Sequence, residues 1–235
     1  MRLTILPGGG FFVHMARLII LANGVVPKLE SARSLIQTGD VLIAADGGTH
    51  HALALGLFPS LVIGDLDSLT PEERQQLDAN SIEIQQYSRD KDETDLELAL
   101  KYACRRGFNK ILVVGALGGR LDQTLGNLSL LTNPELTALD VRMDDGVEEA
   151  FFTRRRCEVH GKPADIVSLI PWRGEVSGVC TEGLHWPLNN ETLFPDKTRG
   201  ISNEMSRETA IISQRSGLLL VIHHRQQSGI DEKAL

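Results

Sequence analysis

Short apolar runs alternate with segments of helical periodicity over the first 150 residues. The apolar runs lie at Leu18–Ala22, Val41–Ala45, Leu61–Ile63, Ile82–Ile84 and Ile111–Val114. The segments with helical spacing lie at Leu29–Thr38, Thr49–Leu55, Pro71–Ala79, Thr94–Arg106 and Asp122–Leu131. Thr70 before Pro71 and Glu73 is a strong helix-start signal. Strand–helix alternation predicts an α/β fold with a mostly parallel sheet that is covered on both faces.

The pattern changes after about residue 150. Strand-like runs at Arg156–Val159, Ile166–Ile170, Glu175–Val179, Thr209–Ile212 and Leu218–His223 are separated by Gly, Pro and Asn turns. Long helical periods are absent from this part of the sequence. The spacing predicts an antiparallel β-sandwich. We therefore expect an α/β domain over 15–150 and a sandwich domain over 151–228, with a tail at 229–235.

Residues 1–14 have no amphipathic period and lack the cleavage pattern of a signal peptide. Met15 is followed within two residues by the first strong strand. We expect residues 1–14 to be a non-native or disordered tail and Met15 to be the natural start.

Composition narrows the classes of protein that the chain can belong to. The 24 basic and 31 acidic residues give a net charge of −7, which argues against a nucleic-acid binder and against disorder. No apolar run approaches the length of a membrane span. The three cysteines, an odd number without a CxxC pair, favour a reducing compartment. We expect a cytoplasmic protein with neither nucleic-acid nor membrane partners.

Polar clusters follow the strands of the predicted sheet, where ligands bind in open α/β folds. The first is Ala44–Gly48, in which Asp46 precedes Gly47 and Gly48, and these glycines can expose backbone N–H groups to an anion. The second is Ile63–Ser68, in which Asp65 and Asp67 are spaced to share a cation. Oxygen ligands of this kind suit Mg²⁺ held together with substrate phosphates.

Two further clusters precede helices. In Arg89–Asp95, Asp92 and Asp95 can share a helix face, and Lys91 can reach a phosphate. Gly115–Asp122 is a glycine-rich loop that leads into a helix, with Arg120 able to bind phosphate oxygens and Asp122 able to orient it. It is neither a Walker loop nor a full dinucleotide fingerprint. Each cluster alone is also compatible with a turn or a helix cap, but four at successive strand ends indicate a Mg²⁺ and phosphate site.

Two adjacent histidine pairs look like metal ligands but are better explained as structural. His50 and His51 begin a helix, where neighbouring residues do not face each other. His223 and His224 lie on the last strand and point to opposite faces.

Five motifs stand in a recognisable order along the chain: AADGG (44–48), IGDLDS (63–68), KDETD (91–95), GGRLDQTLGN (118–127) and GISNE (200–204). On these motifs the chain resembles the thiamine pyrophosphokinase family over about 16–225. The resemblance implies an N-terminal α/β domain, a C-terminal β-sandwich and a homodimer with its site at the interface. It implies Mg²⁺-dependent transfer of pyrophosphate from ATP to thiamine, which yields thiamine diphosphate and AMP.

The resemblance also assigns roles to single residues. It implies metal binding by Asp65, Asp67 and Asp95. The expected catalytic residues are Asp46, Asp92, Arg120 and Asp122. The residues expected at ATP and its phosphates are Gly47, Gly48, Ser68, Lys91, Gly118, Gly119 and Asn127. Those expected at thiamine are Trp186, Ser202 and Asn203. Asp46, Asp92 and Asp122 stay equal candidates for the acceptor of the hydroxyl proton.

The chain departs from the family pattern at two places. Gln123 stands where His is common, and it cannot act as an acid near neutral pH. The segment 194–199 replaces a smaller turn that contains Gly, which puts the geometry of the thiamine loop in question. Two other functions remain open on the sequence: a different Mg²⁺-dependent phospho- or nucleotidyltransferase on this scaffold, and a non-catalytic thiamine- or nucleotide-binding protein.

Overall fold

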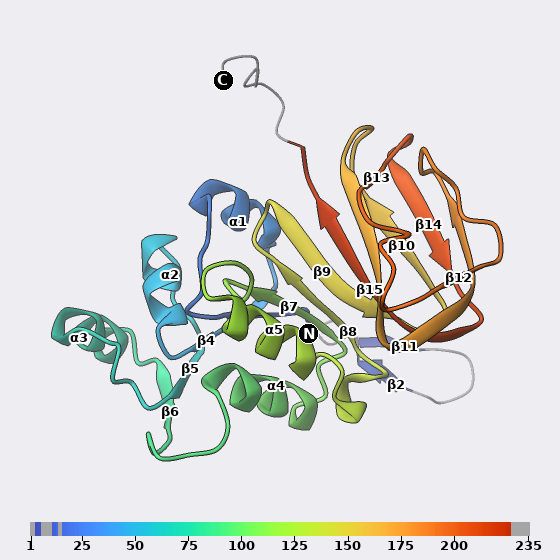
Figure 1. Ribbon diagram of the computed structural model, residues 1–235. Helices are drawn as coiled ribbons and strands as arrows, with labels where there is room; N and C mark the ends of the chain where they lie inside the picture. The colour runs from blue at the N-terminus through green and yellow to red at the C-terminus, as the bar shows by residue number, and fades with distance from the viewer. Residues whose placement is uncertain (1–2, 6–10, 14–15, 227–235) are drawn as a thin grey trace. The chain divides into compact units, whose positions relative to one another are not determined.

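The computed structural model describes residues 3–5, 11–13 and 16–226 (Figure 1). The chain divides into two compact units, Met1–Asp145 and Gly146–Leu235. This division falls five residues before the expected boundary, because β9 (Glu148–Thr153) pairs with β15 (Ser216–His224) of the second unit.

The first unit is built on a parallel sheet, as the sequence predicts. Its strands are β3 (Leu18–Leu21), β4 (Val41–Ala45), β5 (Leu61–Gly64), β6 (Glu83–Gln86), β7 (Lys110–Val114) and β8 (Asp140–Asp144). They lie in the order β8-β7-β3-β4-β5-β6, and every pairing between them is parallel. β3 therefore lies at the centre, and its residues are buried on both faces.

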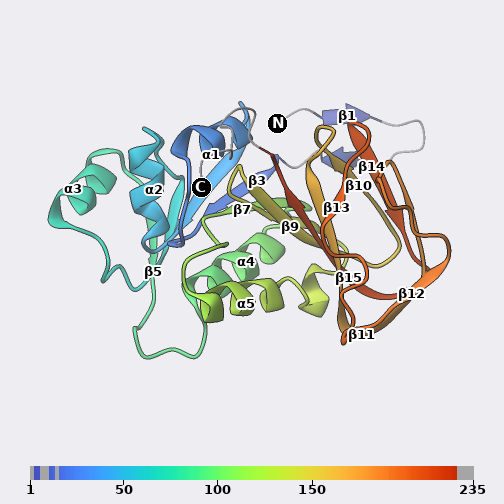
Figure 2. The same cartoon turned by 45° about the horizontal axis from the view of Figure 1, so that its top comes forward.

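Helices cover both faces of this sheet. They are α1 (Leu29–Leu35), α2 (Gly48–Ala54), α3 (Pro71–Ala79), α4 (Asp95–Arg105) and α5 (Leu121–Leu130), with a short 3₁₀ turn at Pro134–Leu136. Ala32 of α1 and Ala52 of α2 pack with Ile19 and Leu21, which lie on one face of β3. Figure 2 shows α1 and α2 on one side of the sheet and α4 and α5 on the other.

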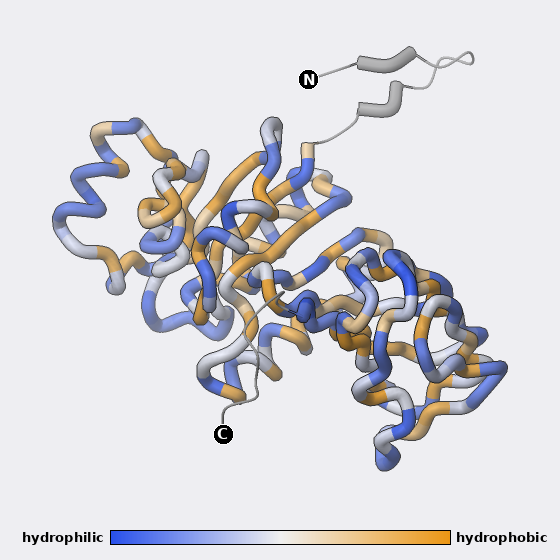
Figure 3. The backbone as a smooth tube through the Cα atoms, turned by 90° about the horizontal axis from the view of Figure 1, so that it is seen from above, coloured by the Kyte–Doolittle hydropathy of each residue, from blue (hydrophilic) through white to orange (hydrophobic). Residues whose placement is uncertain are grey.

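Helix caps explain why two of these helices begin where they do. Thr70 and Glu73 form a reciprocal capping box at α3, with Pro71 at the first helical position. The Thr94 side chain accepts a hydrogen bond from the Glu97 N–H at the start of α4. Figure 3 shows hydrophobic segments in the strands of the sheet, whereas α3, at the left of the view, is mostly hydrophilic.

The second unit is antiparallel. Its strands besides β9 and β15 are β10 (Arg156–His160), β11 (Ile166–Glu182), β12 (Glu191–Leu193), β13 (Asn203–Glu204) and β14 (Thr209–Ser213). β15 lies between β9 and β11, and β14 lies between β10 and β11. Residues of both halves of β11, Val167 and Val176 among them, belong to one buried cluster.

β11 is one long strand where the sequence predicts two. Its first half pairs with β15, its second half pairs with β12 and β14, and the register shifts between Trp172 and Ser177. A strand that bends in this way passes from one layer of a sandwich to the other. Pro171 and Gly174 look like turn residues in the sequence but lie inside this bent strand.

Part of the expected tail contains secondary structure. β1 (Leu3–Ile5) and β2 (Phe11–Val13) pair antiparallel. The remaining residues before 16, Met15 included, and the expected tail at 229–235 lie outside the described residues. No helix among the residues that the structure describes is long and apolar enough to cross a membrane.

Candidate active site

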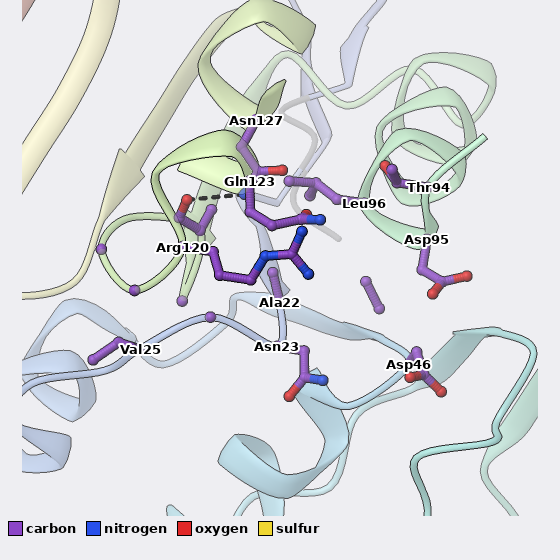
Figure 4. Close-up of a pocket in the computed structure, with 16 residues that line it drawn as sticks. Ala22, Asn23, Val25, Asp46, Thr94, Asp95, Leu96, Arg120, Gln123 and Asn127 are labelled. Atoms are coloured by element: carbon purple, nitrogen blue, oxygen red, sulfur yellow. Dashed lines mark hydrogen bonds between the residues drawn. The ribbon is translucent and has the colours of Figure 1, made fainter. Parts of the chain in front are cut away.

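A cavity of about 490 Å³ lies at the carboxyl edge of the parallel sheet. The loops after β3, β4 and β7 meet the first turns of α4 and α5 there (Figure 4). Its lining residues are Ala22, Asn23, Gly24, Val25, Ala45, Asp46, Thr94, Asp95, Leu96, Gly115, Ala116, Gly118, Gly119, Arg120, Gln123 and Asn127. Parallel strands bring these loops together because their carboxyl ends share one edge.

Three carboxylates gather beside this cavity. One oxygen each of Asp46, Asp65 and Asp67 lies within 4.8 Å of the others. Asp46 is buried, has a left-handed backbone (φ 41°), and its Oδ1 finds no hydrogen-bond partner among the described residues. A buried carboxylate oxygen without a partner is costly unless a cation neutralises it. A donor set made only of carboxylate oxygens fits Mg²⁺.

Asp95 joins this group from the start of α4. A Cβ atom at Gly64, the last residue of β5, would lie 2.8 Å from Cβ of Asp46 and 3.2 Å from Cγ of Asp95. Both acids therefore pack against the bare backbone of Gly64, and any side chain there would push them away. The family resemblance implies a metal ligand at Asp95 and a catalytic residue at Asp46, whereas the structure groups Asp46 most tightly with Asp65 and Asp67.

Two cations pair with these acids. Nε of exposed Arg89 lies 3.4 Å from Oδ2 of Asp67, and the second cation is Lys91. Its Nζ lies 3.1 Å from Oδ1 of Asp95 and 3.6 Å from Oδ2 of Asp65. The Asp67 backbone N–H donates to Asp65 and, together with Lys91, holds the pKa of Asp65 below its ordinary value despite the opposing effect of burial. Burial, with the charges of Asp46 and Asp65, raises the pKa of Asp95 by more than Lys91 lowers it.

The glycine-rich loop before α5 forms one wall of the cavity. Gly118 and Gly119 both have left-handed backbones, with φ of 72° and 71°. Oγ1 of Thr124 donates to the carbonyl of Gly118, and Nδ2 of Asn127 donates to the carbonyl of Ala116. Two successive left-handed residues expose backbone that side chains would otherwise cover, which suits a phosphate. Asn127 therefore holds the loop and also lines the cavity.

Arg120 and Asp122 form a two-bond pair at the start of α5. Nε and Nη2 of Arg120 donate to the two carboxylate oxygens of Asp122. The hydrogen bonds from Arg120 lower the pKa of Asp122 and engage both of its carboxylate oxygens. Figure 4 shows the Arg120 guanidinium extending toward the side of the cavity where Asp46 and Asp95 lie.

The other residues of the first unit that were predicted at the catalytic and ATP sites range from exposed to buried. Asp92 is exposed on the loop before α4 and does not line the cavity. Gly47 and Gly48 are buried, and a Cβ on Gly47 would collide with the side chain of Asn23. Ser68 has a buried hydroxyl without a hydrogen-bond partner among the described residues.

The sequence prediction missed the loop after β3. Asn23, Gly24 and Val25 line the cavity, as does Thr94, the residue that caps α4. The sequence does contain a signal for this loop, because Asn23 and Gly24 follow an apolar run just as Asp46 and Gly47 do. The rule that polar residues gather at strand ends applies to β3 as well.

The predicted thiamine residues lie close together in the second unit. The Trp186 N–H donates to Oδ1 of buried Asn203, and Nδ2 of Asn203 donates back to the Trp186 carbonyl. The Trp186 ring is 48% exposed and packs edge-on against His185, with 4.6 Å between the ring centroids. Ser202, next to Asn203, has φ 57°, and its N–H donates to Ser168 Oγ.

Segment 194–199, which departs from the family pattern, contains part of its own anchor: Arg199, its last residue, pairs with Glu191. Arg199 donates two hydrogen bonds to Glu191 of β12, at 2.9 and 2.8 Å. The pair ties the far end of the segment to the sheet, while Phe194 stays 44% exposed.

The histidine pairs make structural contacts. Nδ1 of His50 is paired with Glu73, and Nε2 of His51 is 2.8 Å from the Gly24 carbonyl. His223 is fully buried with its Nε2 3.0 Å from Oδ2 of Asp165, and His224 is paired with Glu148. None of these histidines belongs to the acidic cluster.

Comparison with known proteins finds two family matches along the chain. Residues 32–143 match the family described as "Thiamin pyrophosphokinase, catalytic domain", and residues 156–219 match "Thiamin pyrophosphokinase, vitamin B1 binding domain". A Bacillus subtilis protein named thiamine pyrophosphokinase is 29% identical over 88% of this chain and 98% of its own length. An Oryza sativa protein named thiamine pyrophosphokinase 1 is 30% identical over 71% of this chain and 67% of its own.

Solved structures show the same fold. The crystal structure of thiamine pyrophosphokinase from Bacillus subtilis has a TM-score of 0.81 at 27% identity, over 90% of this chain and 100% of that one. The yeast thiamin pyrophosphokinase has a TM-score of 0.70 at 15% identity, over 91% and 87% of the two chains.

Proposed function

Since this chain belongs to the thiamine pyrophosphokinase family and is an enzyme of that class, we propose that its acidic cluster binds Mg²⁺ for pyrophosphoryl transfer from ATP to thiamine. One observation carries the proposal. A buried, unpartnered oxygen of Asp46 lies with the carboxylates of Asp65 and Asp67 beside a cavity that Arg120 also lines. Without a cation these acids would repel the phosphates of ATP.

In the reaction, the thiamine hydroxyl oxygen bonds to the β-phosphorus of ATP, and the hydroxyl proton passes to a carboxylate, for which Asp46, Asp92 and Asp122 are the candidates. The bond from that phosphorus to the oxygen it shares with the α-phosphate breaks, and AMP leaves with that oxygen. When bound, Mg²⁺ would supply positive charge that offsets the charge developing on the phosphates. Asp46, Asp65 and Asp67 would hold the metal, with Asp95 beside them.

The chain's own cations would bind the rest of the phosphate charge. Arg120 lines the cavity with its guanidinium fork, which matches phosphate oxygens. Gly118 and Gly119 bring backbone close to the same place. Lys91 already lies among the acids, where its ammonium would contact the phosphates of ATP.

Thiamine would bind in the second unit at Trp186. The thiamine ring is cationic, and the half-exposed indole is suited to stack on it. Asn203 fixes the backbone of Trp186 in both directions, and Ser202 lies beside it on the exposed surface.

We also propose a cytoplasmic homodimer. Leu121 and Leu125 lie one turn apart on α5, next to Arg120, and are 72% and 46% exposed. Apolar side chains beside a polar site are typical of an interface. The three cysteines form no disulfide with one another within the described part of the chain, as in a reducing compartment. Sedimentation of the wild type and of Leu121→Glu tests the dimer: a dimer that the substitution dissociates supports it, and a monomeric wild type refutes it.

Product analysis tests the reaction. The full chain is incubated with thiamine, ATP and Mg²⁺, and nucleotides and thiamine esters are separated. AMP together with thiamine diphosphate is the expected result. ADP would instead indicate an ordinary kinase, and unchanged ATP with bound thiamine would indicate a binding protein.

A further inference from the structure

A polar bridge joins the two helices that follow the acidic loops. Nδ1 of His50, on α2, lies 2.5 Å from Oε1 of Glu73, on α3. Asp46 comes just before α2, and Asp65 and Asp67 come just before α3. The bridge therefore ties together the two elements that carry the three clustered carboxylates.

The Glu73 carboxylate is held at both oxygens. Its Oε2 accepts a hydrogen bond from the Thr70 N–H, and Oγ1 of Thr70 accepts one from the Glu73 N–H. Burial raises the pKa of Glu73, but the hydrogen bonds from His50 and Thr70 outweigh burial and lower it. Glu73 thus remains an acceptor that cannot turn away from His50 without losing the cap of α3.

The same helix also contacts the backbone between the two acids of the second loop. Nη2 of Arg74 donates to the carbonyl of Leu66. Leu66 has a left-handed backbone (φ 65°), which a residue with a branched side chain adopts only when its surroundings hold it there. Its side chain is almost fully buried against Leu69 and Leu77. The position of α3 therefore determines how Asp65 and Asp67 are presented.

We propose that His50 and Glu73 are positioning residues of the acidic cluster, which set the separation of Asp46 from the Asp65–Asp67 loop through the bridge between α2 and α3. This inference rests on the proposed Mg²⁺ site. Neither residue needs to contact the metal. Partners that orient metal ligands commonly change metal affinity by one to two orders of magnitude.

Mn²⁺ binding to the full chain, measured by calorimetry without nucleotide, tests this role. We expect His50→Ala and Glu73→Ala each to weaken Mn²⁺ binding about tenfold. The double variant should be no weaker than either single one, because both remove the same bridge. Glu73→Gln should bind nearly as the wild type, since its amide can accept from Thr70 and donate to His50.

Asn80→Ala is the matched control. Nδ2 of Asn80 donates to the Gln76 carbonyl at the other end of α3. The substitution should lower thermal stability as much as His50→Ala does, but leave Mn²⁺ binding unchanged. If Glu73→Ala fails to fold because it also loses the capping box, His50→Ala keeps the box and still decides the question.

Two results would contradict the inference in distinguishable ways. Mn²⁺ binding that Asp65→Asn abolishes but His50→Ala and Glu73→Ala leave intact would overturn the positioning role alone. A wild-type chain that binds no Mn²⁺, or binds it regardless of Asp65→Asn, would overturn the metal site and the positioning role together.

Discussion

Nζ of Lys91 lies 3.1 Å from Oδ1 of Asp95, four residues away. The same ammonium also lies 3.6 Å from Oδ2 of Asp65, and both acids raise the pKa of Lys91 more than burial lowers it. Lys91 is thus an internal counter-ion of the cluster that we propose to bind Mg²⁺.

Lys91→Met should change two affinities in opposite directions. Loss of the internal charge leaves the acids less neutralised, so Mn²⁺ should bind about fivefold more tightly, from an effect on the order of 1 kcal/mol. The KM for ATP should rise, because a phosphate contact is lost. Calorimetry with Mn²⁺ and steady-state kinetics measure the two effects.

Lys101→Met is the control for this prediction. Lys101 also pairs with two carboxylates, Glu93 and Glu97, but lies outside the acidic cluster. Its loss should leave both affinities unchanged. Equal Mn²⁺ affinity in Lys91→Met and the wild type would show that Lys91 does not compete with the metal.

Asp65→Asn and Asp67→Asn should abolish turnover without unfolding the chain. Each amide keeps the shape of the side chain but loses the charge that a divalent cation requires, so we expect about a hundredfold loss or more in activity. Circular dichroism and kinetics at several Mg²⁺ concentrations check this. Asp78→Asn, an exposed acid on α3, should behave as the wild type. Normal activity in both cluster variants would refute the metal assignment.

Trp186→Ala should mainly weaken thiamine binding. Loss of a cation–π contact worth about 0.5–2 kcal/mol corresponds to an increase of about twofold to thirtyfold in the KM for thiamine. The KM for thiamine of Trp186→Phe should lie between those of the wild type and of Trp186→Ala. Trp172→Phe is the control, since Trp172 packs edge-on against Phe152, with ring centroids 5.4 Å apart. An unchanged KM in Trp186→Ala would argue against stacking.

The ionisation of Asp165 should make the stability of the second unit depend on pH in the acidic range. Burial raises the pKa of Asp165, but hydrogen bonds from the backbone of Lys162, from His223 and from Gln226 lower it below the ordinary value of 3.8. A lowered pKa means that the ionised form stabilises the fold above pH 3.8. This contribution is lost as the pH falls from there through the lower folded pKa.

Asp165→Asn measures this contribution. At neutral pH we expect the free energy of unfolding to fall by about 2 kcal/mol, as for hydrogen bonds to a charged group. The difference from the wild type should shrink as the pH drops below 3.8. Both tryptophans lie in the second unit, so their fluorescence in urea follows its unfolding. A difference that is the same at pH 7 and at pH 3 would contradict the linkage.

Local signals were enough to predict the helices with strong starts. The predicted bounds of α3 coincide with the observed ones, because Thr70, Pro71 and Glu73 define its start by short-range chemistry. The strands β3, β4, β5 and β7 were predicted within about a residue, since a strand buried on both faces is a continuous apolar run.

Tertiary contacts determine the strands that local sequence signals do not predict. β9 begins with Glu148 and Glu149, which resemble loop residues, yet Glu149 is buried 3.7 Å from Nδ1 of His223. The long-range pairing of β11 likewise made a strand through Pro171 and Gly174.

The site was predicted in part for the same reason. Motifs located the acids and the glycine loop, because their chemistry is local. The pairing of Asp122 with Arg120, the exposure of Asp92 and the bridge from His50 to Glu73 depend on side-chain directions and on helix positions. No spacing rule along the chain encodes these relations.

The position of β15 has a consequence for how the protein is made. β15 is the last strand along the described residues, yet it lies between β9 and β11 and hydrogen-bonds to both. The parallel sheet has all its strands once Asp144 has been synthesised. The ribosome therefore releases a chain whose first unit can already have folded, while the second must wait for its final strand. A chain that stops before Ser216 would keep a complete parallel sheet but would leave β9 and the first half of β11 without the strand that joins them.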